Sequence, residues 1–484
     1  ETRKFIESYF TEVGRIFKSE YIHVGGDEAW DIGFCPECAE KAAAYQGEQE
    51  LYLEHFKFCH QVVTKKLRRR MMMWDDMFEY YHDILAKMPK DIIMVNWQYQ
   101  ENVTGYQGHF ANLLFRDQLA EYEELGFDYL VGPADFLWGN VESTANYART
   151  RKPLGGLLTS WEKKTALMYK FFPLMAAAGW LWSGAAQSGE DAMALAVKQL
   201  FGVDDELFIQ AIMQYSSRIK RVAALSAADL MSASFFGPDR YELHALKTMT
   251  SVMMQYSGRL RDSRAEVVLA DIIDDSILKV LAARSQIASF QLLNGQEAES
   301  IDGIVSELDA VAESRIAACD AEHFKANFER WRNALLECKN EVKKKGLMSI
   351  LFCLPDGYGA ERIRISVKSG GKYQEIASGV YKHDHDALFY RCFFLPKNME
   401  VEAVRIEAAG FAGQGVCHVS AKTGKGSFAP AALLSAGGIA EHPEHVLTPD
   451  VNFCYLGSQR TIDAFRDRSG AEMVNWIEIA MKKA

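Results

Sequence analysis

Two adjacent acidic residues, Asp27 and Glu28, follow a short apolar stretch and two glycines in the segment YIHVGGDEAW, residues 21–30. Side chains alternate between the two faces of a regular strand, so neighbouring carboxylates on a strand would point in opposite directions. Gly25 and Gly26 tolerate backbone angles that let the chain leave strand geometry at this place. We therefore expect both carboxylates to face one pocket.

A pair of neighbouring carboxylates is suited to acid–base catalysis. Proximity separates their pKa values, because the charge of one acid opposes the ionisation of the other. The protonated member donates a proton to a leaving group, and the ionised member stabilises positive charge. Two other interpretations of Asp27 and Glu28 stay open: the acids begin a helix, whose N-terminus favours negative charge, or they bind a metal ion in an unrelated α/β enzyme.

The elements that must position these acids alternate between short apolar strands and helices over residues 1–185. The predicted strands are residues 21–25, 70–74, 92–97, 128–132 and 156–160, and the predicted helices are residues 49–69, 78–88, 110–125 and 141–151. This alternation predicts a parallel sheet, either open and doubly wound or part of a (β/α)₈ barrel. Four of the five strands end in polar or aromatic residues. We favour a barrel, because all of its strand ends converge on one pocket.

Three tryptophans, Trp74, Trp97 and Trp161, stand at the C-terminal ends of predicted strands. A single tryptophan at such a place more often belongs to the core. Three of them beside two acids favour a sugar pocket, because an indole ring stacks on the apolar face of a pyranose.

The later parts of the chain differ from residues 1–185 in their periodicity. Residues 186–346 carry helical stripes throughout and predict a helical accessory domain. Residues 347–484 show strands of period two separated by turn residues, which predicts a β-sandwich-like domain with a last helix near residues 473–483. Exposed aromatic residues in such a domain could bind sugar, although packing is the simpler role.

The net charge and the cysteines of the chain indicate which partners and which cell compartment to expect. The net charge of −11 argues against nucleic acid or an anionic membrane surface as a partner. The most apolar stretch, residues 171–184, is shorter than the ~18 residues of a membrane span and contains Pro173. Nine scattered cysteines suggest reduced thiols and a cytoplasmic location. Cys35 and Cys38 lack the second pair that a closed zinc site needs, so we expect unliganded thiols.

The hexapeptide HVGGDE, residues 23–28, resembles the His-x-Gly-Gly-Asp-Glu signature of glycoside hydrolase family 20, the β-N-acetylhexosaminidases. Three more segments are similar to later strand ends of that family: MMMWDDMF (71–78), VNWQY (95–99) and LLTSWEKK (157–164). The last of them is similar to the hexosaminidase D-like branch. The resemblance implies a TIM-barrel catalytic domain over residues 1–185, in which the five strands are the fourth to the eighth and the first three are expected to be missing.

The resemblance implies a retaining exo-β-N-acetylhexosaminidase that acts by substrate-assisted catalysis. The 2-acetamido oxygen of the sugar would attack the anomeric carbon and form an oxazolinium intermediate. Asp27 would orient the acetamide and stabilise its charge, while Glu28 would protonate the glycosidic oxygen and then activate water. The implied partners are glycans that end in N-acetylglucosamine or N-acetylgalactosamine, with no cofactor and no metal. The alternative is a non-catalytic carbohydrate-binding relative.

The resemblance also implies a set of substrate-binding residues: Trp74, Asp76, Trp97, Tyr99, Trp161 and Glu162. The tryptophans would wall the acetamido pocket, and Tyr99 would donate its hydroxyl to the acetamide oxygen. Glu162 and Asp76 are candidates for binding sugar hydroxyls. The family places its glutamate two residues after the last tryptophan, where this chain has Lys163. The role of Glu162 and the choice between gluco and galacto substrates therefore stay open.

Overall fold

The computed structural model describes most of the chain, in the following ranges: residues 1–29, 31–45, 47–108, 115–135, 137–160, 167–218, 230, 240–293, 297–319, 322–341, 344–353, 362–379, 388–409, 414–438, 440–447, 454–456 and 474–484. The chain divides into two compact units. The first comprises Glu1–Lys163, Leu167–Arg221 and Ser251–Ile272, and the second consists mainly of Ile273–Ala484.

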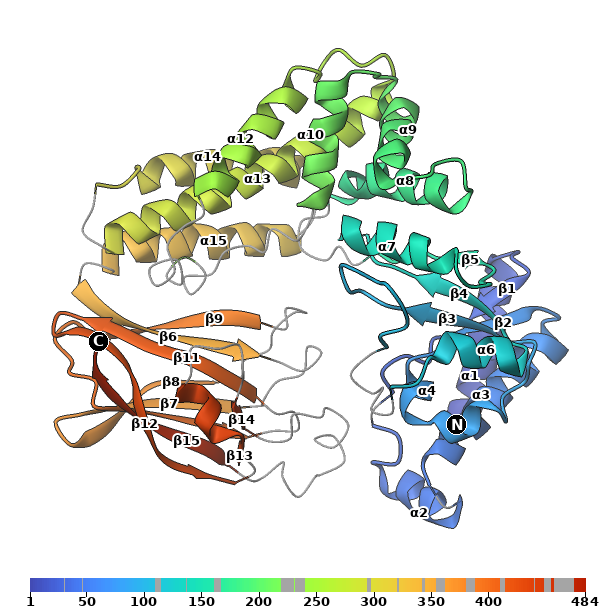
Figure 1. The fold of residues 1–484 in the computed structure, drawn as a ribbon, viewed down its shortest axis with the longest axis horizontal. Helices are drawn as coiled ribbons and strands as arrows, with labels where there is room; N and C mark the ends of the chain where they lie inside the picture. The colour runs from blue at the N-terminus through green and yellow to red at the C-terminus, as the bar shows by residue number, and fades with distance from the viewer. Residues whose placement is uncertain are drawn as a thin grey trace. The chain divides into compact units, whose positions relative to one another are not determined.

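A five-stranded parallel sheet in the order β1-β2-β3-β4-β5 forms the centre of the first unit (Figure 1). Its strands are β1 (Tyr21–His23), β2 (Arg70–Trp74), β3 (Ile93–Trp97), β4 (Asp128–Gly132) and β5 (Gly155–Gly156). Every pairing between neighbours is parallel, as the sequence predicts. Strand β5 is shorter than expected, but backbone hydrogen bonds and a bridge between Ala134 and Thr159 continue its contact with the segment after β4. All five strand ends therefore lie along one edge of the sheet.

Helices connect these strands. They are α1 (Thr2–Ile16), α2 (Pro36–Tyr45), α3 (Gln49–Gln61), the π-turn η1 (Val62–Lys66), α4 (Met77–Tyr80), α5 (His82–Leu85), α6 (Gln118–Leu125) and α7 (Trp138–Ala148). Helix α6 packs against β4 and begins later than predicted. The side chain of Asp117 accepts the backbone N–H of Ala120 and so caps its first turn. Gly126, with φ +77°, ends the helix. Residues 109–114 of the predicted helix lie outside the described part.

The described chain between residues 168 and 341 is mainly helical, and this includes most of residues 186–346, whose periodicity predicts helices. Its elements are η2 (Met168–Phe171), α8 (Phe172–Trp182), α9 (Gly189–Phe201), α10 (Glu206–Ser217), α12 (Arg240–Met254), α13 (Ser263–Leu293), α14 (Ile301–Cys319) and α15 (Glu322–Glu341). Neighbours along the chain pack together, including α8 with α9 and α14 with α15. Among the residues that the structure describes, no helix combines the length and the apolar character needed to cross a membrane.

An antiparallel sheet makes up the rest of the second unit, as predicted for the C-terminal part of the chain. Its strands are β6 (Lys345–Cys353), β7 (Arg362–Ser369), β8 (Lys372–Gly379), β9 (Leu388–Pro396), β10 (Ala403–Ala409), β11 (Gln414–Thr423), β12 (Gly426–Gly437), β13 (Ala440–Glu441), β14 (Cys454–Leu456) and β15 (Asn475–Lys483). Figure 1 shows β6, β9 and β11 in one layer and β7, β12 and β15 in another. One apolar cluster takes residues from both layers, so the sheet folds over a common core.

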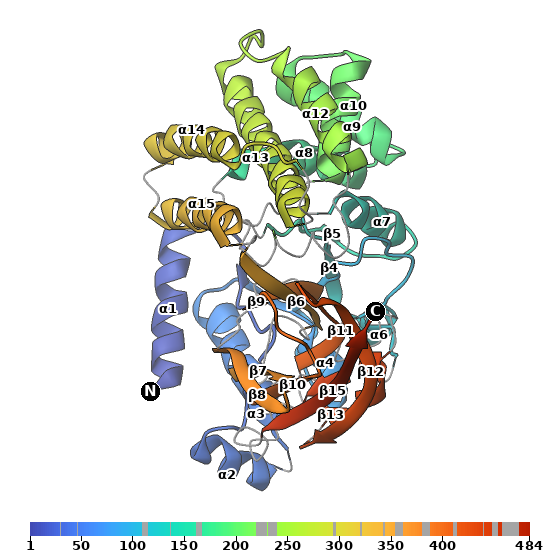
Figure 2. The same cartoon turned by 90° about the vertical axis from the view of Figure 1, so that its left-hand side faces the viewer.

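The predicted last helix near residues 473–483 is wrong, because the structure forms strand β15 there. This strand lies between β10 and β12, and Figures 1 and 2 show it beside β12. The side chains of Ile477, Ile479 and Met481 are buried, whereas the residues between them are partly exposed. This alternation has the period of a strand. Tertiary pairing on both edges therefore overrides the helix-forming alanine, glutamate and lysine residues of the segment.

Truncation of Ile479 tests the position of β15 in the core. Ile479 is 0% exposed, so we expect Ile479→Ala to lower the free energy of unfolding by about 2–5 kcal/mol. Lys482→Ala, on the exposed end of the same strand, should change it by less than about 0.5 kcal/mol. Urea denaturation of both variants measures the difference. Equal effects of the two substitutions would contradict the burial of Ile479.

Candidate functional site

The chain leaves strand β1 through a turn that requires glycine. Gly25 has φ +77° and Gly26 has φ +109°, both in the region that residues with a side chain avoid. Nδ1 of His23 accepts the N–H of Gly25 at 3.1 Å, and the Tyr52 hydroxyl donates to the carbonyl oxygen of Gly26 at 2.9 Å. A Cβ at Gly26 would lie 3.0 Å from the Phe56 ring. The two glycines thus provide the departure from strand geometry that the sequence predicts.

The turn delivers Asp27 and Glu28 to the edge where the parallel strands end. Asp27 is exposed and Glu28 is half-buried. Glu28 itself has φ +47°, an uncommon conformation for a residue with a side chain. The next helix, α2, begins only at Pro36, so the acids do not begin a helix as one interpretation of the sequence proposed.

Asp76 connects the acid pair to the neighbouring strands. Its carboxylate is 1% exposed and follows β2. Oδ2 accepts the backbone N–H of Glu28 at 2.8 Å, and Oδ1 accepts the indole N–H of Trp97 at 3.3 Å. One buried carboxylate therefore holds together the ends of β1, β2 and β3.

Acidic groups gather around the hydroxyl of Tyr52, which lies beneath the glycine turn. Burial raises the pKa of Tyr52 well above its usual range, and the carboxylates of Asp76, Asp75 and Asp27 raise it further. Tyr52 therefore stays a neutral hydrogen-bond donor to Gly26. Asp27, Asp75 and Asp76 thus all act on the same hydroxyl group.

Aromatic rings occupy three of the predicted positions at this edge. The rings of His23 and Trp74 have centroids 4.6 Å apart, and those of Trp97 and Tyr99 have centroids 4.9 Å apart. The Tyr99 hydroxyl also accepts a hydrogen bond from Thr159 at 3.0 Å. The structure thus brings Trp74, Trp97 and Tyr99 to the same edge as Asp76.

Two predicted site residues, Trp161 and Glu162, lie outside the described residues. The chain is described up to residue 160, where Thr159 contacts Tyr99. Their positions relative to the acid pair therefore stay a prediction.

A buried network around Asp75 was missed by the sequence reasoning. Asp75 is 0% exposed, and its Oδ2 accepts from Asn96 Nδ2 at 2.9 Å and from the Tyr122 hydroxyl at 2.8 Å. Burial raises the pKa of Tyr122 well above its usual range, and Asp75 raises it further. Tyr122 therefore remains a donor, and Asp75 joins the end of β2 to β3 through Asn96 and to α6 through Tyr122. The only sequence signal was a second pair of adjacent acids, Asp75 and Asp76, after a strand.

Asp135 is another acid at a strand end that the sequence reasoning passed over. It follows β4, is fully buried, and donates its backbone N–H to the carbonyl oxygen of Thr159 at 2.9 Å. Asn140 Oδ1 accepts the N–H of the preceding residue, Ala134, at 2.9 Å. The segment GPAD at residues 132–135 carries a polar residue just beyond the strand, so the same criterion applied to the other four strands would have found it.

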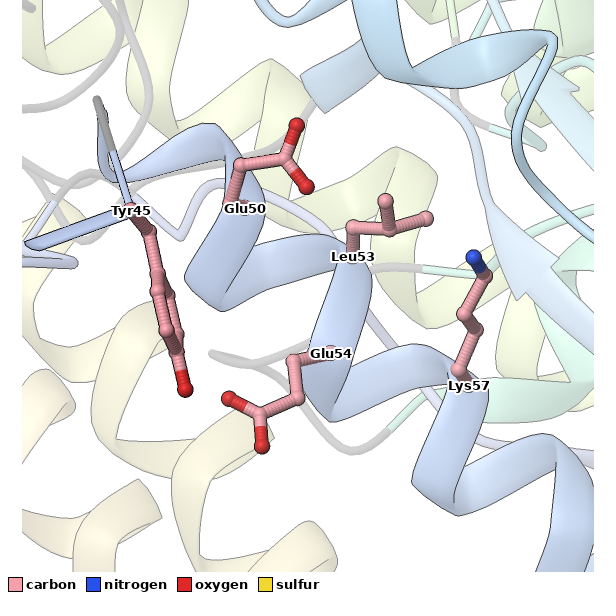
Figure 3. Close-up of a pocket in the computed structure, with 5 residues that line it drawn as sticks. All are labelled: Tyr45, Glu50, Leu53, Glu54 and Lys57. Atoms are coloured by element: carbon pink, nitrogen blue, oxygen red, sulfur yellow. The ribbon is translucent and has the colours of Figure 1, made fainter. Parts of the chain in front are cut away.

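A hollow on the surface of the first unit lies apart from these residues. Figure 3 shows its lining: Tyr45, Glu50, Leu53, Glu54 and Lys57, from α2 and α3. Glu50 and Glu54 are engaged by Lys87 and Arg3, respectively. None of the five lining residues belongs to a strand end, so we do not assign this hollow to the acid pair.

The pKa of His23 gives a pH-dependent prediction for stability. Burial lowers it to about 4 from the usual 6.5, so folding favours the neutral ring that accepts the Gly25 N–H. This contribution is complete above pH 6.5 and is lost as the pH falls towards 4. We expect it to reach about 3 kcal/mol.

The matched variant is His23→Asn, whose amide oxygen replaces Nδ1 as acceptor but does not titrate. Urea denaturation of both proteins between pH 7 and pH 4 isolates the effect, because all other groups titrate in both. The stability of the His23→Asn protein should fall less over this range. Parallel curves would contradict the assignment.

Comparison with known proteins gives a family match over a region that includes Asp27, Glu28 and the ends of β1, β2 and β3. Residues 1–113 match the family model described as "Glycosyl hydrolase family 20, catalytic domain". The chain is 28% identical over 142 residues to Beta-hexosaminidase 1 of Coccidioides posadasii (strain RMSCC 757 / Silveira). That match covers 28% of this chain and 21% of the relative, so the chain spans about one fifth of the relative's length.

Comparison with solved structures gives a match to the alpha-toxin of Clostridium perfringens from avian strain SWCP. The sequences are 11% identical, and the match covers 54% of this chain and 69% of that chain. Its TM-score of 0.13 is too low to support an argument about fold or function.

Proposed function

We propose that the protein is a retaining exo-β-N-acetylhexosaminidase, because residues 1–113 match the catalytic-domain model of glycosyl hydrolase family 20. Its substrates are glycans or glycoconjugates that end in N-acetylglucosamine or N-acetylgalactosamine. The observation that carries the proposal is the acid pair at the end of β1, within the matched region and joined to β2 and β3 by Asp76.

In the proposed reaction the sugar supplies its own nucleophile. The 2-acetamido oxygen attacks the anomeric carbon and forms an oxazolinium ion, while the bond to the leaving group breaks. Glu28 gives its proton to the departing oxygen and later removes a proton from the water that opens the ring. Asp27 accepts the acetamide N–H and stabilises the positive charge. The two inversions at the anomeric carbon give net retention.

The aromatic side chains of the strand ends form the proposed acetamide pocket. Trp74 and Trp97 offer ring faces, and Tyr99 donates its hydroxyl to the acetamide oxygen. Trp161 and Glu162 are proposed to complete the pocket. The contacts of Asp76 with Glu28 and Trp97 support a positioning role for that carboxylate rather than direct binding of sugar hydroxyls.

The proposal extends to the architecture. The five parallel strands are proposed to correspond to the fourth to eighth strands of a (β/α)₈ barrel within residues 1–185. Residues 186–346 are proposed as a helical accessory domain, and residues 347–484 as a β-rich domain.

The test is hydrolysis of a pair of aryl glycosides that differ only at C2. The protein should hydrolyse an aryl N-acetyl-β-glucosaminide or galactosaminide and release the β-anomer first, as followed by NMR. The matched glucoside with a hydroxyl at C2 lacks the internal nucleophile and should not turn over. Equal hydrolysis of both substrates, or release of the α-anomer, would refute the substrate-assisted mechanism.

A non-catalytic carbohydrate-binding protein is the second candidate. The exposure of Asp27 favours it, because a carboxylate in contact with water stabilises a nearby positive charge less than a shielded one. Binding of an oxazoline-like inhibitor without turnover of any aryl N-acetylhexosaminide would support this candidate. Turnover that disappears in Asp27→Asn would exclude it.

A further inference from the structure

We propose that His442, Glu444 and His445 form a surface site for zinc or a similar divalent transition-metal ion. The three residues lie in the second unit, at the 3₁₀ turn η5 (Pro443–Leu447), between the short strands β13 and β14. They take no part in the proposed hydrolysis. The site is inferred from their mutual geometry and from the chemistry of the three side chains.

The three ligand atoms already lie around one point. Oε1 of Glu444 is 3.7 Å from Nδ1 of His442 and 3.9 Å from Nε2 of His445. All three atoms lie within 4.8 Å of one another. Around a tetrahedral zinc ion with bonds of about 2.0–2.2 Å, neighbouring ligand atoms are roughly 3.4 Å apart. Zinc geometry therefore requires closer approach of the ligand atoms and a rotation of the stacked imidazoles that turns their lone pairs towards one point.

The backbone presents the two imidazoles on the same side. Residues three apart in a 3₁₀ turn are eclipsed, and the N–H of His445 donates to the carbonyl oxygen of His442 at 3.0 Å. The two rings stack with centroids 4.9 Å apart and an interplanar angle of 12°. Pro443 fixes the backbone between them, and Val446 is buried in the core of the sheet. The ligands are thus held by a rigid, anchored turn.

The donor set selects the kind of ion. Two imidazoles and one carboxylate are ligands that zinc accepts, whereas magnesium and calcium prefer oxygen ligands alone. His442 and Glu444 are exposed, so an ion can enter from solvent and water can fill the remaining coordination position. The bound ion would link His442, the residue before η5, to Glu444 and His445 within it.

Zinc titration of the full-length, reduced and metal-stripped protein tests the proposal. Isothermal titration calorimetry should show one equivalent of bound Zn²⁺, not displaced by excess Mg²⁺. The His442→Ala/His445→Ala variant should lose this equivalent, and Glu444→Gln should bind it more weakly. Circular dichroism checks that each variant is folded.

Two controls separate this site from other zinc-binding groups. His82→Ala removes an imidazole that faces a single carboxylate, Asp83, at 2.8 Å, and should leave binding unchanged. Cys35→Ser/Cys38→Ser removes the exposed Cys35 thiol and the partly exposed Cys38 thiol at the start of α2, and should also leave zinc binding unchanged. Bound Co²⁺ should show no thiolate charge-transfer band. The proposal fails if the wild-type protein binds no stoichiometric zinc, or if the double histidine variant binds it as tightly as the wild type.

Discussion

Replacing Glu28 by glutamine should lower turnover of an N-acetyl-β-hexosaminide with a poor leaving group by about 10²–10⁴-fold. Glutamine has no proton to give to the departing oxygen and cannot remove one from water. The substitution keeps the size of the side chain. It also leaves the backbone N–H of residue 28, which donates to Asp76 at 2.8 Å. The fold should therefore remain intact, and the loss should appear in kcat rather than in stability.

The leaving group separates this role from a general effect on the site. A nitrophenyl leaving group departs without a proton, so Glu28→Gln should retain more of its first-step activity on that substrate. Added azide should then attack the intermediate and give a β-glycosyl azide, because it needs no general base. In Asp27→Asn, turnover should fall by a similar factor for both leaving groups, because Asp27 would act on the acetamide and not on the leaving group. A Glu28→Gln protein that hydrolyses poor leaving groups as fast as the wild type would refute the assignment.

The conformation of Glu28 supports a functional rather than a structural reason for its presence. Its φ of +47° costs roughly 1–2 kcal/mol for a residue that carries a side chain. Glycine at this position would relieve the strain, as Gly25 and Gly26 do on the preceding residues. Strained residues of this kind persist at active sites, where the side chain is needed in that place.

The strands were predictable because their signal is local. Short apolar runs flanked by glycines and charged residues place β2 and β4 at the residues predicted and β3 within one residue. At β15 the same local reasoning failed. The composition of this segment favours a helix, and only its pairing with β10 and β12 makes it a strand with alternating burial. The glycine turn was predictable for the same reason as the strands, because positive φ depends on residue type.

Hydrogen bonds between distant segments were not predictable from the sequence. Asp76 is 48 positions from Glu28 and 21 from Trp97, yet its two oxygens accept from both. Nothing in the local sequence distinguishes it from Asp75, which turns instead towards Asn96 and Tyr122. The sequence therefore predicts that β2 is followed by acidic residues. Only the fold shows that Asp75 and Asp76 have different hydrogen-bond partners.

This difference between neighbouring acids gives the second large prediction, for Asp76→Asn. The amide keeps one oxygen as acceptor, but its NH₂ group would face either the Glu28 N–H or the Trp97 indole N–H. A buried donor then loses its partner, which costs about 1–3 kcal/mol of stability. The bond that fixes Glu28 to the end of β2 is also weakened, and a displacement of about 1 Å at the reacting groups can lower kcat by about 10²-fold.

Asp75→Asn is the matched control, since it introduces the same chemical change at an adjacent buried carboxylate. The donors Asn96, from β3, and Tyr122, from α6, both reach Oδ2 of Asp75, so the amide oxygen of asparagine can keep both bonds and the substitution should lower stability less than Asp76→Asn does. Below the melting temperatures of both proteins, kcat should fall much further in Asp76→Asn than in Asp75→Asn. Equal losses of kcat would mean that destabilisation alone explains the effect. An unchanged kcat in Asp76→Asn would mean that Glu28 is held in place without the bond from Asp76, and would contradict the positioning role of that carboxylate.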